Sequence, residues 1–542
     1  MARLDSLEEN PPLKSFRFGH APALWLALPL LIGCSIDRLY QPDPRFFLVG
    51  AFSFLLLATV AMCYAKICLI ALSIAGIFLG AIWHQVKLPP QNPIEPHNPF
   101  AEISVLIEQA QNQRTGKSWT GIGMVTDKGD YFRRRVALQV QGIAPAKGTE
   151  LKLSGALSAV PKKPRGFDAW IASQGATLKL GPAKVLGVLE EPGRFSKWCW
   201  RTNQYLEKWL RALPWDDEDG GAMLAATMLG RTSLLPEEAK KAYAETGTLH
   251  LFAISGLHIA GMAAALLWII RRTPLPEKPT GLCILALLWI YVQVTGASPS
   301  SLRAWIMAFF LWAGQSQERA TPILQSLALA CATTLLLQPE ASSDPGFQLS
   351  YLAVLSIILV GAPAAEKLNG LSLIEKLTPR GTLSVKQRLI IRSKHFLCSG
   401  FCISFAATIA GTPLTLSYFN TASWGGIFAN IILVPLSEIP LILGLVSLTL
   451  SFSENLWPIA QCLNGLAATV LQWMTSIADT LTLLPHLTQS GIPSEWFSGS
   501  LCALVLLICF FKQAEEKCPY RLMGFPALIV VLWLIFFVHP MN

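Results

Sequence analysis

From His395 to Phe511 the chain contains no lysine and no arginine. A water-soluble protein does not fold so long a segment without basic surface residues, because soluble chains carry about 25% charged residues. Over all 542 residues the chain has 14% charged and 52% hydrophobic residues, and its mean hydropathy is +0.45. We therefore predict a polytopic α-helical membrane protein, in which each helix of about 20 apolar residues crosses the bilayer.

Apolar segments separated by polar turns predict about 11–13 transmembrane helices. The candidate spans lie near residues 21–37, 46–63, 67–84, 249–270, 281–296, 302–315, 323–337, 347–363, 395–418, 425–452, 457–485, 497–511 and 522–538. The number is a range because several of these segments are shorter than a full span. We expect the first span to be retained, since a long polar leader precedes it and a second span follows closely.

Basic loops predict the orientation in the membrane. Arg3, Lys14 and Arg17 precede the first span, and the predicted loop 366–394 carries seven Lys or Arg residues on the same side. Because such loops stay in the cytoplasm, we expect a cytoplasmic N-terminus. The polar region between the third and fourth spans then lies outside the cytoplasm.

This outside region, residues 87–190, is basic and shows the alternation of β-strands. Between Ala101 and Trp200 there are 15 Lys or Arg and 8 Asp or Glu residues. Apolar and polar residues alternate in segments 121–125, 135–141, 150–155 and 177–181. About five such strands predict a small β-barrel of the OB type, a fold that often binds single-stranded nucleic acid. A solubilising domain with ordinary surface lysines has the same composition, so both interpretations stay open.

The chain therefore divides into five predicted parts. They are N-terminal transmembrane helices (1–86), the extracytoplasmic OB-like domain (87–190), interfacial helices (191–235), a transmembrane core (236–511), and a C-terminal loop with the last transmembrane helix (512–542). Within the third part, residues 198–213 mix aromatic and basic residues at helical spacing. This pattern predicts a helix that lies on the membrane surface, with a partner-binding helix as the alternative.

Polar residues interrupt the apolar spans of the core. The candidate functional residues are His250, Ser255, Gly256, His258, Arg303, Gln348, Ser350, Asn430 and Glu438. We also expect helix breaks at Gly411–Pro413 and at Pro435. Such groups are tolerated at membrane depth only where they meet protein or water, so we expect them to line a hydrated interior.

Other interpretations of these residues stay open. His250 and His258 are either hydrogen-bonded core histidines or functional groups, and Arg303 either reaches the membrane surface from a span end or meets anionic groups in a conduit. Ser255 with His250 or His258 suggests an intramembrane serine hydrolase, and a transporter for a small anion is a further alternative. No Gly-x-x-x-x-Gly-Lys-Ser/Thr motif or metal-type histidine cluster occurs, so we expect no cofactor, metal or catalytic residue in a channel-type protein.

The segment from Gly247 to His258 (GTLHLFAISGLH) resembles a highly specific motif of the ComEC family of competence proteins. Further similar segments are 161–168, 174–175, 229–231, 299–304, 345–351 and 430–436, so the resemblance covers most of residues 20–510. It implies a channel in the bacterial inner membrane that takes up single-stranded DNA during natural transformation. It also implies an extracytoplasmic DNA receptor and a cytosolic ATP-driven motor as partners, besides membrane lipid.

The resemblance has one departure. Many members carry a C-terminal metallo-β-lactamase-like domain, and we expect this chain to be a short form without it. A separately encoded nuclease would then degrade the second strand. A basic outer domain suits the polyanionic strand, and the residues expected to contact DNA first are Arg133, Arg134, Arg135, Lys162, Lys163 and Arg165.

Overall fold

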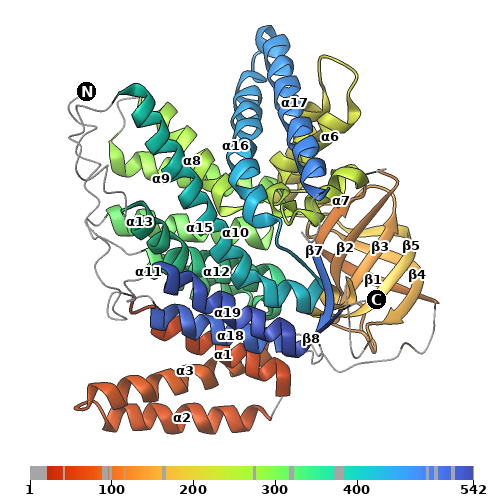
Figure 1. The fold of residues 1–542 in the computed structure, drawn as a ribbon. Helices are drawn as coiled ribbons and strands as arrows, with labels where there is room; N and C mark the ends of the chain where they lie inside the picture. The colour runs from red at the N-terminus through yellow and green to blue at the C-terminus, as the bar shows by residue number, and fades with distance from the viewer. Residues whose placement is uncertain are drawn as a thin grey trace.

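A computed structural model describes the fold. The described residues are 21–40, 43–87, 96, 100–114, 116–161, 167–272, 276–316, 323–370, 384–483, 488–493, 498–513 and 519–540. The chain is mostly helical, and a small β-barrel lies at one side of the helices (Figure 1).

Four helical segments in the described part of the chain are long and apolar enough to cross a membrane. They are α3 (Ala65–Lys87), the continuous segment Pro345–Asn369, α15 (Val385–Phe419) and α16 (Gly426–Leu450). Shorter apolar helices cover Leu24–Asp37, Pro44–Val60, Gly256–Trp268, Pro279–Val294, Ile323–Leu337, Ser498–Lys512 and Met523–Phe537. These segments coincide with predicted spans, while the total of 11–13 transmembrane helices stays a prediction.

The remaining helices are α1 (Leu24–Tyr40), α2 (Pro44–Val60), α4 (Phe167–Ser173), α5 (Arg194–Arg211), α6 (Glu218–Leu229), α7 (Glu237–Glu245), α8 (Gly256–Ile270), α9 (Glu277–Val294), α10 (Pro299–Ser316), α11 (Ile323–Leu337), α12 (Pro345–Ser356), α13 (Ala362–Asn369), α17 (Trp457–Thr482), α18 (Ser498–Gln513) and α19 (Pro519–Phe537). A π-helical turn, η6 (Ile357–Gly361), joins α12 to α13, and short 3-10 turns are η3 (Thr232–Leu234), η4 (Leu249–Phe252), η5 (Pro339–Ser343) and η8 (Glu454–Leu456).

Buried side chains divide the helices into two clusters. The α15 cluster contains α1, α11 to α13, α15, α18 and α19, and the α17 cluster contains α5 to α9, α16 and α17. Helix α10 belongs to both, because Met307 packs on the α15 cluster while Ala304 and Trp305 pack on the α17 cluster. The seam between the two clusters therefore passes along α10.

The outside region forms a closed five-stranded barrel in the order β1-β2-β3-β5-β4. The strands are β1 (Phe100–Asn112), β2 (Ser118–Val125), β3 (Arg135–Gln141), β4 (Glu150–Ala159) and β5 (Ala176–Glu190), and the pairing of β3 with β5 is parallel. The four strands located from the sequence are confirmed. Strand β1 was missed because the half-buried Leu106 obscures the alternation of the buried Ile103, Val105 and Ile107, and a bulge after Ile107 shifts the alternation. The OB-type assignment stays a prediction.

Two predictions about the core were wrong. Residues Gly411–Pro413 do not break α15, which continues through them to Phe419. Nearby hydroxyls take up backbone carbonyls, as Thr415 Oγ1 does with the Gly411 carbonyl at 3.2 Å, and such bonds allow proline within a membrane helix. Helix α16 likewise continues through Pro435.

The predicted loop 366–394 is also shorter than expected. Helix α13 continues to Asn369, and α15 begins at Val385. A capping box starts α15, since the Ser384 hydroxyl accepts from Gln387 N–H while the Gln387 side chain accepts from Ser384 N–H. Because of this capping box, residues 385–394, the basic end of the predicted loop, are helical.

The predicted surface helix exists as α5, but it is packed more deeply than expected. Asn203 and Trp209 are buried, and Trp209 Nε1 donates to Ser447 Oγ of α16 at 3.3 Å. Phe195 and Trp198, near the start of α5, are exposed, so the N-terminal part of the helix is what remains for a membrane surface. An unpredicted small sheet joins β6 (Thr421–Ser423), β7 (Thr488–Pro493) and β8 (Val538–Pro540).

Candidate functional site

Ser255 and His258 together cap the N-terminal end of α8. Ser255 N–H donates to His258 Nδ1 at 3.2 Å, and His258 N–H donates to Ser255 Oγ at 3.4 Å. This reciprocal pattern is that of a capping box, with histidine in place of the usual Glu or Gln. The Ser255 hydroxyl also lies 2.8 Å from Nδ1. The motif therefore has a local structural purpose that the sequence did not reveal.

The capping box also fixes the state of the His258 ring. Because a backbone N–H donates to Nδ1, the proton of the neutral ring lies on Nε2. The side chain is buried, and Nε2 has no hydrogen-bond partner among the described residues. A buried donor of this kind calls for water or a ligand. His250, in contrast, is exposed and donates from Nδ1 to the Gly247 carbonyl at 3.2 Å.

Arg303 is a buried cation at the seam. Its side chain extends from α10, and Nη2 donates to the Gly346 carbonyl in the first turn of α12 at 2.8 Å. Its carbon Cζ lies 5.7 Å from the ring centre of Phe347. Nε and Nη1 have no partner within the described part of the chain. Arg303 does not reach a membrane surface, because the residue is only 3% exposed.

Gln348 connects three elements of the α15 cluster. Its Nε2 donates to the Ser342 carbonyl of η5 at 2.8 Å, and its Oε1 accepts from the Tyr418 hydroxyl of α15 at 3.1 Å. Ser350 is half-buried on the same helix. Gln348 is therefore a polar side chain whose amide, hydrogen-bonded at both ends, holds the start of α12 in place.

Asn430 and Glu438 lie on α16, which packs against α8. Both are partly buried, and Asn430 Oδ1 and Glu438 Oε1 have no partner among the described residues. The Glu438 carboxylate lies against Gly261 of α8, where a Cβ atom would sit 2.5 Å from Oε2. Glycine at 261 is thus what leaves room for this carboxylate, three residues beyond His258.

The predicted core residues consequently form two groups. Ser255, His258 and Glu438 belong to the α8–α16 contact, and Arg303 and Gln348 surround the first turn of α12. In the part of the chain that the structure describes, no hydrogen bond joins one group to the other. His258 and Arg303 are buried, while Ser255, Gln348 and Glu438 are partly buried.

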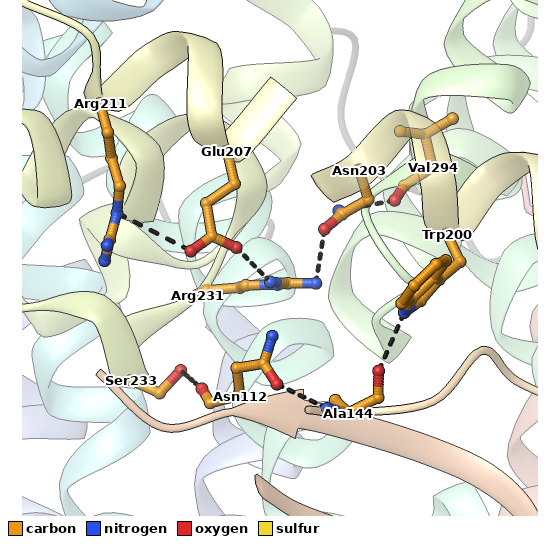
Figure 2. A network of polar contacts seen from close by, with 9 residues as sticks. All are labelled: Asn112, Ala144, Trp200, Asn203, Glu207, Arg211, Arg231, Ser233 and Val294. Atoms are coloured by element: carbon orange, nitrogen blue, oxygen red, sulfur yellow. Dashed lines mark hydrogen bonds and ion pairs between the residues drawn. The ribbon is translucent and has the colours of Figure 1, made fainter. Parts of the chain in front are cut away.

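A buried arginine outside the spans organises the α17 cluster near the barrel (Figure 2). Arg231 Nη1 donates to Glu207 Oε2 at 3.0 Å, and Nη2 donates to Asn203 Oδ1 at 2.6 Å. Asn203 in turn donates to the Val294 carbonyl at 2.8 Å. Burial lowers the pKa of the Arg231 guanidinium, and the Glu207 charge offsets part of this effect.

The barrel is attached next to this network (Figure 2). Ser233 Oγ donates to the Asn112 carbonyl at the end of β1 at 3.1 Å. Trp200 Nε1 of α5 donates to the Ala144 carbonyl at 2.9 Å, and Ala144 N–H donates to Asn112 Oδ1 at 2.6 Å. The barrel is therefore fixed to the helices through backbone groups as well as side chains.

The three consecutive arginines of the barrel differ in their surroundings. Arg133 is exposed, whereas Arg134 is buried. Arg135 forms ion pairs with Glu108 and Glu340, each at 2.9 Å. Burial acts to lower the pKa of Arg135, but the two carboxylates outweigh it and raise the pKa above its ordinary value. Of the three, only Arg133 presents a freely exposed side chain to a first contact with DNA. Lys162, Lys163 and Arg165 lie outside the described residues.

A groove of about 380 Å³ lies on the outer face of the barrel. It is bordered by all five strands of the barrel and by α4, and its polar and aromatic lining residues include Gln109, Gln111, Thr120, Gln139, Trp170 and Lys179. Lys179 pairs with Asp168, which neutralises its charge. The sequence missed this groove, since its residues come from five strands and a helix.

Comparison with known proteins decides the family. The model of the family described as "Competence protein" matches residues 227–515, which include both groups of core residues. The chain belongs to this competence protein family. The match confirms the ComEC-type resemblance and the transmembrane character that the sequence predicted.

Three curated relatives are similar to the chain over part of their length. ComE operon protein 3 of Bacillus subtilis (strain 168) is 24% identical over 329 residues, 59% of this chain and 38% of that protein. Recombination protein 2 of Haemophilus influenzae is 27% identical over 232 residues, 41% of this chain and 28% of that protein. Uncharacterized protein YcaI of Escherichia coli (strain K12) is 26% identical over 278 residues, 47% of this chain and 32% of that protein. The similarity thus spans well under half of each relative, and no solved structure matches.

Proposed function

We propose that this competence-family protein is a channel that takes up single-stranded DNA across a bacterial inner membrane. The observation that carries the proposal is the set of buried polar atoms that have no partner among the described residues of an apolar bundle: His258 Nε2, Arg303 Nε and Nη1, and Glu438 Oε1. Each such atom costs about 1–3 kcal/mol if it stays unsatisfied. Water or a passing polar strand is the natural partner.

The seam between the two helical clusters is the proposed path. Arg303 lies on α10, the helix that both clusters share, and two of its guanidinium nitrogens, unpartnered within the described part of the chain, can bind a phosphate. From His395 to Phe511, a segment that includes α16 and α17, no Lys or Arg occurs. A single cation attracts the strand without the series of strong phosphate sites that would hold it in place.

The incoming DNA strand first binds in the barrel groove under this proposal. Trp170 offers a surface on which a base stacks, and the amides of Gln109, Gln111 and Gln139 match the hydrogen-bonding edges of bases. The exposed Arg133 then contacts phosphate. Stacking tolerates any base sequence because every base has a π-face, as an uptake protein requires.

Topology and partners complete the proposal. We place the N-terminus in the cytoplasm and the barrel on the extracytoplasmic side, where a DNA receptor delivers the strand. A cytosolic ATP-driven motor supplies the energy, and a separate nuclease removes the second strand.

The test is uptake of labelled DNA into a nuclease-protected pool in cells that produce Arg303→Ala. We expect at least a tenfold loss, because an interaction of about 1.4 kcal/mol corresponds to a factor of ten. Arg392→Ala, which removes an exposed arginine of α15, is the matched control and should keep full uptake. Full uptake by Arg303→Ala at normal membrane levels would remove the channel proposal.

A second candidate, the serine hydrolase, has one observation in its favour. Ser255 Oγ lies within hydrogen-bond distance of a histidine nitrogen, as in nucleophilic dyads. The capping box explains the same contact, so we place the hydrolase second.

A further inference from the structure

A second polar link joins the barrel to the start of α12. Arg135 of β3 pairs through Nη2 with Glu340 of η5 at 2.9 Å, while its Nε pairs with Glu108 of β1 at 2.9 Å. The side chains of Arg135 and Glu340 are 15% and 21% exposed. The pair is therefore better shielded from water than an ordinary surface salt bridge.

Gln174 continues this link towards the spans. Its carbonyl accepts from Arg135 Nη1 at 3.2 Å, and its side-chain Nε2 donates to Asp344 Oδ1 at 2.9 Å. The other carboxylate oxygen of Asp344 accepts from Phe347 N–H at 3.1 Å, which makes Asp344 the N-cap of α12. One carboxylate thus receives a barrel side chain and a helix amide at the same time.

The first turn of α12 is also where Arg303 is held. The Gly346 carbonyl that accepts from Arg303 lies two residues beyond Asp344. The Asp344 charge also attracts the guanidinium. A change in how Asp344 is held therefore displaces the carbonyl and the charge that together set the position of Arg303.

We propose that Gln174 and Asp344 are positioning residues for Arg303. The position of the barrel relative to α12 then determines where the buried Arg303 guanidinium lies. The contact itself does not depend on DNA, but its consequence for uptake rests on the proposed function. In this arrangement a strand that shifts the barrel alters the interior cation without touching it. Gln174 acts through Asp344, and Asp344 acts through the first turn of α12.

Hydrogen exchange of the purified full-length protein tests the positioning link by itself. In Gln174→Ala the amides of Phe347 and Gln348 should exchange about tenfold faster, because Asp344 loses one of the two donors that hold its carboxylate. Gln141→Ala removes an exposed glutamine from the end of β3 and should change neither amide. Unchanged exchange at Phe347 in Gln174→Ala would overturn the proposal.

Two checks keep a misfolded variant from imitating the result. The amides of β2 and β3 should keep their wild-type exchange, which shows that the barrel is intact. Gln174→Glu places a carboxylate against Asp344, and repulsion should accelerate exchange in the α12 turn more than the alanine does. If the glutamate variant behaves like wild type, the contact does not hold α12.

Uptake in a double-mutant cycle tests the consequence. Gln174→Ala should lower DNA uptake about tenfold in the wild-type background but less than twofold when combined with Arg303→Lys, since both changes act on one step. Effects that multiply independently would refute positioning. If exchange changes as expected while Arg303→Ala retains full uptake, the link stands and the channel proposal fails.

Discussion

Replacing Ser255 with alanine distinguishes a helix cap from a catalytic dyad. The alanine removes the oxygen that accepts from His258 N–H at 3.4 Å and bonds Nδ1 at 2.8 Å. Loss of a serine N-cap costs about 0.5–2 kcal/mol. The accepted bond is long, and Ser255 N–H still donates to Nδ1 in the variant. We therefore expect a loss of about 1 kcal/mol in the free energy of unfolding.

Unfolding of the purified full-length protein in detergent measures this loss. Ser255→Asn should recover most of the stability, because asparagine caps helices as well as serine does. Ser476→Ala is the matched control, since this serine lies exposed on α17 and bonds only to a carbonyl of its own helix.

Uptake measurements then complete the comparison. As a cap, the asparagine variant should take up DNA at a rate within about twofold of wild type, whereas a nucleophile has no substitute in an amide. Unaltered stability in Ser255→Ala, together with loss of activity in both variants, would refute the cap and favour the hydrolase.

Three further predictions follow from single contacts. Gly261→Ala should reduce uptake at normal protein levels, because the added methyl group displaces the Glu438 carboxylate. Gly524→Ala, where a Cβ meets open space, should leave uptake unchanged, and equal effects of the two variants would contradict this prediction. Arg231→Ala should destabilise the protein by about 1–3 kcal/mol in thermal unfolding, because it removes the hydrogen bonds to Glu207 and Asn203 and leaves Glu207 with Arg211 alone, and a wild-type melting curve would show that the network is dispensable. Trp170→Ala should weaken binding of single-stranded DNA to the full-length protein by at least fivefold at fixed salt, as loss of a stacked base worth about 1–3 kcal/mol requires, and unchanged anisotropy titrations would exclude the groove.

Local patterns predicted the elements of the fold. Alternation located β3 at its observed bounds, Arg135–Gln141, because half of its side chains fill the barrel core. Helix ends that are set by a single side chain were harder to predict from the sequence. The Ser384 capping box extended α15, and hydroxyl groups near Pro413 preserved a helix that proline was expected to break.

The site was predictable in residue type but not in arrangement. His258 and Arg303 drew attention because polar groups in apolar spans are costly, and both are buried. Their partners depend on contacts between distant segments, such as Arg303 with Gly346 and Gln174 with Asp344. The arginine run looked like one surface, but the strand pairing leaves only Arg133 exposed. Asp344 before a Pro-Gly pair was the one local signal of a helix cap in this region.

Photocrosslinking on α16 tests the passage most directly. Asn430 is partly buried on α16, while Phe428, two residues earlier on the same helix, is 57% exposed. With benzoylphenylalanine at either position, irradiation during uptake of labelled single-stranded DNA should give protein–DNA adducts at 430 and none at 428. Adducts at 428 alone, or at neither position while uptake proceeds, would show that the strand does not pass through the interior of the helices.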